Sequence, residues 1–361
     1  MVHFTQLSKK QKILGIILVS SILLILIPIL LLRFLPYPEL DVFLKERQYS
    51  TRIFDCNHNL IQILPLENGL RREYTPLEDI PEEIIKAFIQ AEDQHFYSHF
   101  GIDVGSVLRA SFQNISNKTT ISGASTITMQ LARIISPSPS RNILAKGKEA
   151  LNALRLELRL SKSQILELYL NNLPFGFNTE GVSTAARSFY GKKLKSLTQE
   201  EIYTLAVIPR RPQSYNPLTN PENCAERASQ IFNIPKDTLV KTTKNAKTYE
   251  YPFLMPHYIQ FLIDNEEKNQ IGIYKKEDII LSASLDVQFL AEELLSKELE
   301  KYRDNRISNG AILVTDTQTG QILAWVGSGD FANESTKGQI DGVLAENQPG
   351  SSMKPFLYAL A

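Results

Sequence analysis

The spacing of apolar residues changes twice along the 361-residue chain, which divides it into three kinds of sequence. Residues 13–32 carry no charge at all. From residue 79 to about residue 210, apolar positions recur every three or four residues, and residues 311–328 alternate around an Asp-Thr-Gln-Thr-Gly turn. These patterns predict a membrane helix, a helical domain and a β-hairpin, in that order.

The uncharged segment is long enough to cross a bilayer. Twenty residues in a helix span about 30 Å, the thickness of the hydrocarbon core. Lysines at positions 9, 10 and 12 precede the segment and Arg33 follows it, a bias that places the N-terminus in the cytoplasm. A cleaved signal peptide is the alternative, but it would have a shorter apolar region followed by small residues. We expect an uncleaved anchor with the rest of the chain outside.

Candidate helix starts divide the central region, and the predicted class is mainly α. Prolines at 209, 212, 217 and 221 close the helical run. The stretch GVSTAARSFYGKKLKSLT, which begins at residue 181, reads as a helix that ends near Gly191. Three pairs have the spacing of a capping box: Asp79 with Glu82, Ser161 with Gln164, and Thr198 with Glu201.

The remaining elements suggest further segments on both sides of the helical domain. Residues 50–75 alternate like short strands around an Asn-His-Asn turn, and the hairpin at 311–328 lies too close to Ala361 to bury a core of its own. We therefore expect a tail at 1–12, the anchor at 13–32, a juxtamembrane strand and turn segment at 33–75, the helical domain at 76–225, a linker region at 226–305 and the α+β start of another domain at 306–361.

Composition excludes several classes of function. The net charge is zero, so the overall charge does not favour nucleic acid as a partner. The two cysteines, Cys56 and Cys224, are far apart and lack metal-ligand spacing, which predicts two unpaired, buried thiols.

The stretch AEDQHFYSHFG at 91–101 combines acids with rings. Glu92 ends the first predicted helix of the domain, with Phe88 one turn earlier on the same face. Lost hydration and the negative end of the helix dipole both raise the pKa of a carboxyl group there, toward the range where a general base works. The alternatives are a pair of surface acids for Glu92 and Asp93, and a core histidine satisfied by backbone carbonyls for His99.

The stretch SGASTITMQLARI at 122–134 predicts a second helix, capped by Ser122 or Ser125. Thr126, Gln130 and Arg133 fall at i, i+4 and i+7, so they form one polar stripe. A hydroxyl, an amide and a guanidinium in line suit an oxygen-rich ligand such as a sugar or a phosphate. A solvated helix face is the alternative.

A third stretch, residues 141–171, concentrates positive charge near an acid. Lys146 and Glu149 are three residues apart on one helix face, with Arg141 and Lys148 nearby. Beside a site, these residues would supply positive charge for a departing phosphate and a second carboxylate. The alternative is an ordinary surface ion-pair face.

Together, EDQHFYSHFG, GASTITMQLAR, and KGKE followed by SKSQILELYLN resemble the successive motifs of the family-51 peptidoglycan glycosyltransferases, the first extracytoplasmic domain of class A penicillin-binding proteins. The likeness is dense over residues 70–225. SLDVQ and the ending QPGSSMKPFLYALA resemble the linker and the opening of the attached transpeptidase domain. LPFGFNTEG and that ending are most similar to the 1C type.

The resemblance implies a lysozyme-like helical fold and an inverting transfer. Glu92 would take the proton from the 4-hydroxyl of lipid II, whose oxygen attacks the lipid-linked glycan strand at C1. Glu149 would be the second acidic residue, near the pyrophosphate. No cofactor is obligatory; a divalent ion, Mg²⁺ or Mn²⁺, is left open, and its ligands are unknown. The other implied substrate contacts are Asp93, Phe96, His99, Thr126, Gln130, Arg133, Arg141, Lys146 and Lys148.

The resemblance also implies a bacterial cytoplasmic membrane protein with an extracytoplasmic catalytic domain, acting beside other cell-wall synthesis proteins. One position departs from the family: Ala145 stands where an arginine is usual, and we hypothesise that Arg141 compensates for the lost charge. Ser351 and Lys354 form an S-x-x-K motif, the nucleophile and amine of the transpeptidase reaction. The partner motifs do not follow within this chain, so we do not expect it to transpeptidate.

Two rival interpretations remain at this point. Lysozymes and lytic transglycosylases share a helical fold and a catalytic glutamate, so the chain could cut glycan strands instead of building them. A non-catalytic scaffold for wall-synthesis partners is the other alternative, to which Ala145 and the incomplete second domain lend weight.

Overall fold

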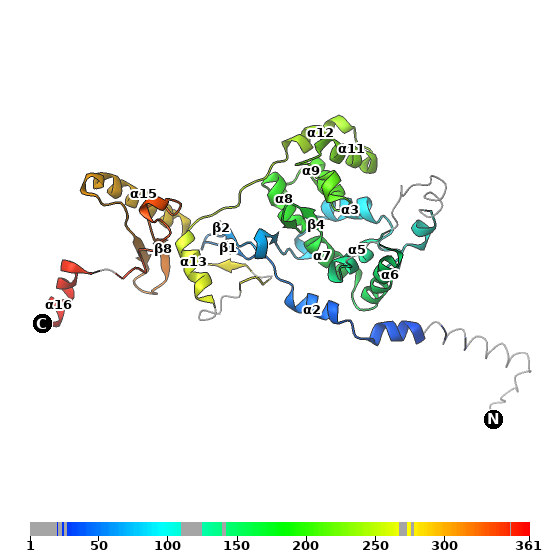
Figure 1. Cartoon of the computed structure of the whole chain (residues 1–361), viewed down its shortest axis with the longest axis horizontal. Coiled ribbons are helices and arrows are strands. Elements are labelled where there is room, and N and C mark those ends of the chain that lie inside the picture. Colours follow the sequence, from blue (N-terminus) through cyan, green and yellow to red (C-terminus); the bar gives the residue numbers. More distant parts are fainter. Residues whose placement is uncertain are drawn as a thin grey trace, which may run out of the picture. The chain divides into compact units, whose positions relative to one another are not determined.

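The computed structural model describes residues 20, 24, 27–109, 125–138, 142–266, 273–275, 278–346 and 348–361 (Figure 1). It consists of two compact units. The first unit combines residues 1–47 with 70–249, and the second combines 48–69 with 250–361. The segment at 33–75 therefore contributes to both units.

Most of the predicted anchor at 13–32 lies outside the described residues. Within the part of the chain that is described, no helix combines the length and the apolar composition needed to cross a membrane.

The first unit is mainly helical, as predicted. A sheet of three short strands in this unit has the order β3-β5-β4, with β3 parallel and β4 antiparallel to β5. The strands are β3 (Arg71–Arg72), β4 (Pro174–Gly176) and β5 (Thr179–Glu180). Its helices include α2 (Pro38–Glu46), α3 (Glu82–Glu92), α5 (Ile127–Ile135), α6 (Ile143–Glu157), α7 (Lys162–Asn172), α8 (Val182–Tyr190), α9 (Gln199–Val207), α10 (Pro212–Tyr215), α11 (Pro221–Phe232) and α12 (Lys236–Asn245).

A continuous apolar core holds α3, α5, α7, α8 and α9 together. Phe88 of α3 and Phe189 of α8 both meet the ring of Phe175 edge to face, with centroids 6.2 and 6.4 Å apart. All three rings are at most 1% exposed. Burying one such side chain contributes about 1.5–3 kcal/mol. The core therefore fixes the C-terminal end of α3, where Glu92 lies, against β4 and α9.

The helix ends test the predicted caps. The capping boxes of Ser161 with Gln164 and of Thr198 with Glu201 are confirmed at the starts of α7 and α9, and Gly191 ends α8 in the left-handed conformation. The cap at Asp79 is wrong. A 3₁₀ turn at Leu77–Asp79 precedes α3, and Pro81 occupies the N-cap position without a side-chain bond.

The cap of α5 also differs from the prediction. Thr126 is the N-cap residue, and its hydroxyl accepts a hydrogen bond from the N–H of Met129 at 3.1 Å. Ser125 lies one residue too early for this role, and Ser122 lies outside the described residues. Thr126 therefore begins the helix as its N-cap residue.

The second unit contains the predicted strands and hairpin. Its first sheet has the order β2-β1-β6, in which β1 (Arg52–Phe54) is antiparallel to β2 (Leu60–Ile63) and parallel to β6 (Ile279–Ile280). The hairpin of β7 (Ile312–Thr315) and β8 (Ile322–Val326) is confirmed. The helices described in this unit include α13 (Pro256–Asp264), α15 (Leu285–Lys301) and α16 (Lys354–Leu360).

The prediction of two buried thiols is half right. Cys224 is buried in α11, and desolvation raises its thiol pKa to about 12. Cys56 is exposed, because it lies in the turn between β1 and β2. Both are free.

Candidate active site

Glu92 lies at the end of α3 with only 8% of its surface exposed. Its Oε2 accepts a 2.7 Å hydrogen bond from the side-chain amide of Gln130. The Oε1 atom is buried and has no hydrogen-bond partner among the described residues. Gln130 in turn accepts a bond from the hydroxyl of Tyr169 on α7, at 3.2 Å. One carboxylate oxygen is therefore held and the other is left unpaired.

Burial raises the pKa of Glu92 above its ordinary value. The amide of Gln130 opposes this shift, because it donates to the charged form, and the positive charges of Arg210, Arg227 and Arg133 oppose it more weakly. Desolvation is the largest effect, so the carboxyl group binds its proton more tightly than an exposed glutamate. The direction is the one expected from the sequence.

Asp93 lines the cleft and also connects the loop after α3 to the start of α5 through hydrogen bonds. It is 7% exposed, and its carboxylate oxygens lie 3.0 Å from Nε2 of His99. One of them also accepts the N–H of Ile127 at 2.9 Å. The side chain of His99 is thus buried and held by a carboxylate, not by the backbone carbonyls that the alternative interpretation required. Its Nδ1 is buried without a hydrogen-bond partner among the described residues.

Phe96 and Gly101 belong to the same loop and fix it by packing. Phe96 is fully buried, and the ammonium group of Lys162 lies 4.4 Å from its ring centroid. Gly101 has a φ of +75°, and its carbonyl accepts the hydroxyl of Thr126 at 2.6 Å. A Cβ at Gly101 would meet backbone atoms of Ala153 at 3.1 Å, so both its conformation and its packing favour glycine. These residues shape the site indirectly, through the backbone of the loop.

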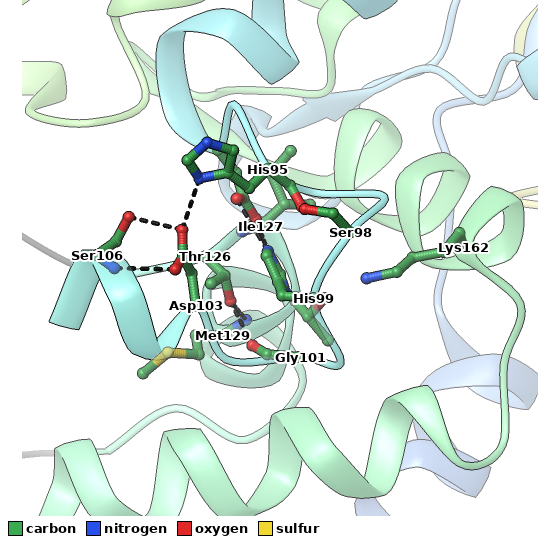
Figure 2. Close-up of polar contacts among 12 residues, drawn as sticks. His95, Ser98, His99, Gly101, Asp103, Ser106, Thr126, Ile127, Met129 and Lys162 are labelled. Atoms are coloured by element: carbon green, nitrogen blue, oxygen red, sulfur yellow. Dashed lines mark hydrogen bonds and ion pairs between the residues drawn. The ribbon is translucent and has the colours of Figure 1, made fainter. Parts of the chain in front are cut away.

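A second polar cluster, which the sequence did not predict, follows in the same loop (Figure 2). Asp103 accepts hydrogen bonds from the hydroxyl and N–H of Ser106, at 2.6 and 2.9 Å, and lies 2.9 Å from Nδ1 of His95. Arg109 donates to the Ser106 hydroxyl at 2.7 Å. The Ser106 contacts, and after them His95, hold the pKa of Asp103 below its ordinary value. The cluster orients His95, whose side chain is 56% exposed.

These groups line a cleft of about 410 Å³. Three arginines line the cleft, at positions 109, 210 and 227. None of them is among the site residues predicted from the sequence. They come from three separate segments of the chain, so no local spacing could have revealed them. The full lining is Gln90, Ala91, Glu92, Asp93, Gln94, His95, Asp103, Ser106, Arg109, Ser125, Thr126, Arg210, Arg227, Gln230 and Ile231.

The predicted charges of α6 reach the edge of this cleft through Ser125. The ammonium group of Lys146 donates to the Ser125 hydroxyl at 2.6 Å and to Glu149 at 2.8 Å. Arg133 and Lys148 are exposed. Arg141 lies outside the described residues, so its compensation for Ala145 stays a prediction.

The described residues contain no group of three His, Cys, Asp or Glu side chains that could hold a metal ion. Glu149 is paired with Lys146, a cation that would compete with a metal for the same carboxylate. Within the described part of the chain, the residues around Glu149 therefore do not fit a metal site.

The S-x-x-K motif lies in the second unit. Ser351 is part of a 3₁₀ turn at Gly350–Met353, and Lys354 begins α16. Both residues are exposed.

Comparison with known proteins points to one family. Residues 57–235 match the family described as Transglycosylase. Penicillin-binding protein 1F from Bacillus subtilis is 32% identical over 96% of this chain and 50% of its own length. Penicillin-binding protein 1C from Escherichia coli is 33% identical over 81% of this chain and 38% of its own. The chain thus spans half or less of the length of these relatives.

A solved structure of penicillin-binding protein 1A from Haemophilus influenzae is similar at 17% identity and a TM-score of 0.42, over 87% of this chain and 52% of that one. That likeness is too weak to define the fold. The family match and the relatives together show that residues 57–235 belong to the Transglycosylase family and that class A penicillin-binding proteins are homologues over most of the chain.

Proposed function

We propose that the first unit is a peptidoglycan glycosyltransferase that polymerises lipid II into β-1,4 glycan strands and releases undecaprenyl pyrophosphate. The observation that carries the proposal is the state of Glu92. Its carboxyl group is buried, has one unpaired oxygen and opens on a cleft with three arginines. A base with a raised pKa beside positive charge suits a reaction that removes a hydroxyl proton and expels a phosphate.

In the proposed reaction, Glu92 accepts the proton of the acceptor 4-hydroxyl. The freed oxygen forms a bond to C1 of the donor sugar, while the bond from C1 to the pyrophosphate oxygen breaks with its electron pair. Attack opposite the leaving group inverts α to β. Pyrophosphate carries its own charge, so the site needs cations more than it needs an acid. A glycoside hydrolase, in contrast, must protonate a sugar oxygen.

The cations of α6 are the proposed contacts for the leaving group. Lys146 is held at the cleft edge by Ser125 and Glu149, which supports this role and makes Glu149 the residue that positions the ammonium group. Exposed Arg133 and Lys148 would contribute at longer range, and Arg141 would replace the charge missing at Ala145. A divalent ion near Glu149 is not required by this scheme.

Three further parts of the proposal concern the whole chain. The first unit would have a lysozyme-like helical fold. Residues 13–32 would anchor the protein in the bacterial cytoplasmic membrane, with the N-terminus inside and the catalytic unit outside, where it meets lipid-linked substrates and other wall-synthesis proteins. Ser351 and Lys354 would be the first motif of a transpeptidase domain.

The test is incubation of the detergent-solubilised protein with labelled lipid II, followed by gel separation of the products. We expect a ladder of glycan strands that lysozyme digests. A parallel reaction with purified sacculi separates the rivals: soluble muropeptides without polymer would make the protein a hydrolase. No product from either substrate would favour a scaffold.

A further inference from the structure

The amide of Gln130 stands between Glu92 and a tyrosine that the mechanism above does not use. Gln130 donates from Nε2 to Glu92 at 2.7 Å and accepts at Oε1 from the hydroxyl of Tyr169 at 3.2 Å. The three side chains come from α5, α3 and α7, and all are nearly or fully buried. Only this orientation of the amide presents a donor to the carboxylate.

The reversed amide would be costly on both sides. Its oxygen would face an ionised Glu92, and two acceptors repel each other. Its NH₂ group would face Tyr169, whose hydroxyl proton would then be buried without an acceptor, because among the described residues that hydroxyl bonds to Gln130 alone. An unsatisfied buried donor costs free energy. Tyr169 therefore disfavours the reversed orientation.

Tyr169 is suited to act as a permanent donor. It is 0% exposed, and burial raises the pKa of its hydroxyl well above the ordinary value, with the charge of Glu92 adding to the shift. The hydroxyl thus keeps its proton at every pH where the enzyme would be assayed. Its bond to Gln130 then depends only on geometry.

We propose that Tyr169 is a positioning residue, which locks the side-chain amide of Gln130 with its NH₂ group toward Glu92 and so keeps the carboxylate in its proton-accepting form. The proposal rests on the proposed role of Glu92. It assigns no contact with substrate to Tyr169.

Removing the hydroxyl releases the amide. In Tyr169→Phe, Oε1 of Gln130 loses its donor, and reversal of the amide no longer leaves a buried hydroxyl proton without an acceptor. Of the two costs, only the repulsion between the amide oxygen and ionised Glu92 remains, and protonation of Glu92 removes it. The reversed orientation accepts a hydrogen bond from protonated Glu92 and thereby stabilises the neutral carboxylic acid. The charged and titratable groups that face Glu92 stay in place: Asp93 beside it, Arg133 from α5, Arg210 after α9 and Arg227 from α11.

The first measurement is the pH dependence of polymerisation on lipid II. In Tyr169→Phe, the Gln130 amide loses the hydrogen bond that favours its present orientation. The acid limb of kcat/KM should therefore move to a pH higher by about 0.5–1 unit. On that limb the rate would fall about 3- to 10-fold relative to wild type. Tyr190→Phe is the matched control, because it removes another buried hydroxyl, bonded to Thr204 at 2.6 Å on α9. Its acid limb should not move.

A second variant tests the route through the amide. Gln130→Met removes the donor itself, so its acid limb should also move upward. Adding Tyr169→Phe to Gln130→Met should then change nothing further, since coupled residues are not additive. An upward shift in both single variants, without a further shift in the double variant, is the expected pattern.

A third measurement does not depend on catalysis. Stability falls as the pH rises from the unfolded-state pKa of Glu92 to its higher folded-state pKa. Glu92→Gln should melt above the protein that keeps Glu92, and this difference in melting temperature should grow with pH until the folded-state pKa of Glu92 is passed. When both proteins also carry Tyr169→Phe, the difference should level off at a higher pH. If the folded variant shows neither this change nor a moved acid limb, Tyr169 only fills space and the proposal is wrong. If the wild type makes no polymer but the difference levels off at a higher pH, the positioning survives and the proposed function fails.

Discussion

Replacing Glu92 with glutamine separates the loss of a base from the loss of a structural contact. The substitution keeps the shape of the side chain and leaves an amide oxygen to accept the 2.7 Å bond from Gln130. Glutamine cannot take a proton from a sugar hydroxyl. General-base catalysis contributes about 10²–10⁴-fold, so polymerisation should fall by that factor, equivalent to about 2.7–5.5 kcal/mol of transition-state stabilisation.

Stability should change in the opposite direction. The carboxylate of Glu92 is 8% exposed, and burial opposes its charge. Neutral glutamine avoids that cost, so Glu92→Gln should melt at the same temperature as wild type or higher. Because the folded-state pKa is raised, wild type is destabilised progressively as the pH rises between the unfolded and folded pKa values. The advantage of the variant should therefore be absent at acid pH and largest at neutral pH.

Glu73→Gln is the control for this experiment. Glu73 is also fully buried, but its oxygens lie 3.1 and 3.2 Å from the guanidinium of Arg187, and it does not line the cleft. Breaking one partner of a buried ion pair leaves the other uncompensated, so stability should fall while polymerisation stays near the wild-type rate. Calorimetry and the lipid II assay measure both quantities. Undiminished polymerisation by a folded Glu92→Gln would refute the reasoning and its assignment of the base.

Three other predictions concern the surroundings of the site. Lys146→Met should lower the lipid II turnover by about 10²-fold, since one positioned donor to a developing anion is worth roughly that much; turnover like wild type would remove the residue from the leaving-group site. Asp93→Ala should lower the free energy of unfolding by about 2–4 kcal/mol, because His99 and the N–H of Ile127 lose a buried partner. Urea denaturation measures this change, and a loss below the error of the fit would contradict it. Thr198→Ala should cost about 1 kcal/mol through the lost capping box of α9, and an unchanged urea midpoint would count against that cap.

Local patterns were sufficient wherever a contact joins near neighbours in the chain. The capping boxes at Ser161 and Thr198 involve residues three apart, and the hairpin of β7 and β8 follows from alternation around one turn. Lys146 and Glu149 meet at 2.8 Å because a helix brings residues three apart together. In each case the geometry of a single element decides the contact.

Errors arose where a competing residue took over a local role. The sequence proposed Ser122 or Ser125 as the cap of α5, but the backbone places Thr126 there, with its hydroxyl between Met129 and Gly101. A 3₁₀ turn ends at Asp79, so that residue does not reach the N-cap of α3. Which of several adjacent polar residues becomes the cap depends on how the preceding loop enters the helix, and tertiary packing sets that entry.

The sequence by itself therefore determined the helical class of the first unit, the end of α3 at Glu92 and the chemical types that gather there. Only the tertiary structure decided that Glu92 is buried with one oxygen unpaired, that Gln130 and Tyr169 form a hydrogen-bonded chain with it, and that Arg210 and Arg227 line the cleft. The physical reason is distance along the chain. Glu92 and Tyr169 are 77 positions apart, and no periodicity within a helix links them. Packing of α3, α5 and α7 around a common core brings them together.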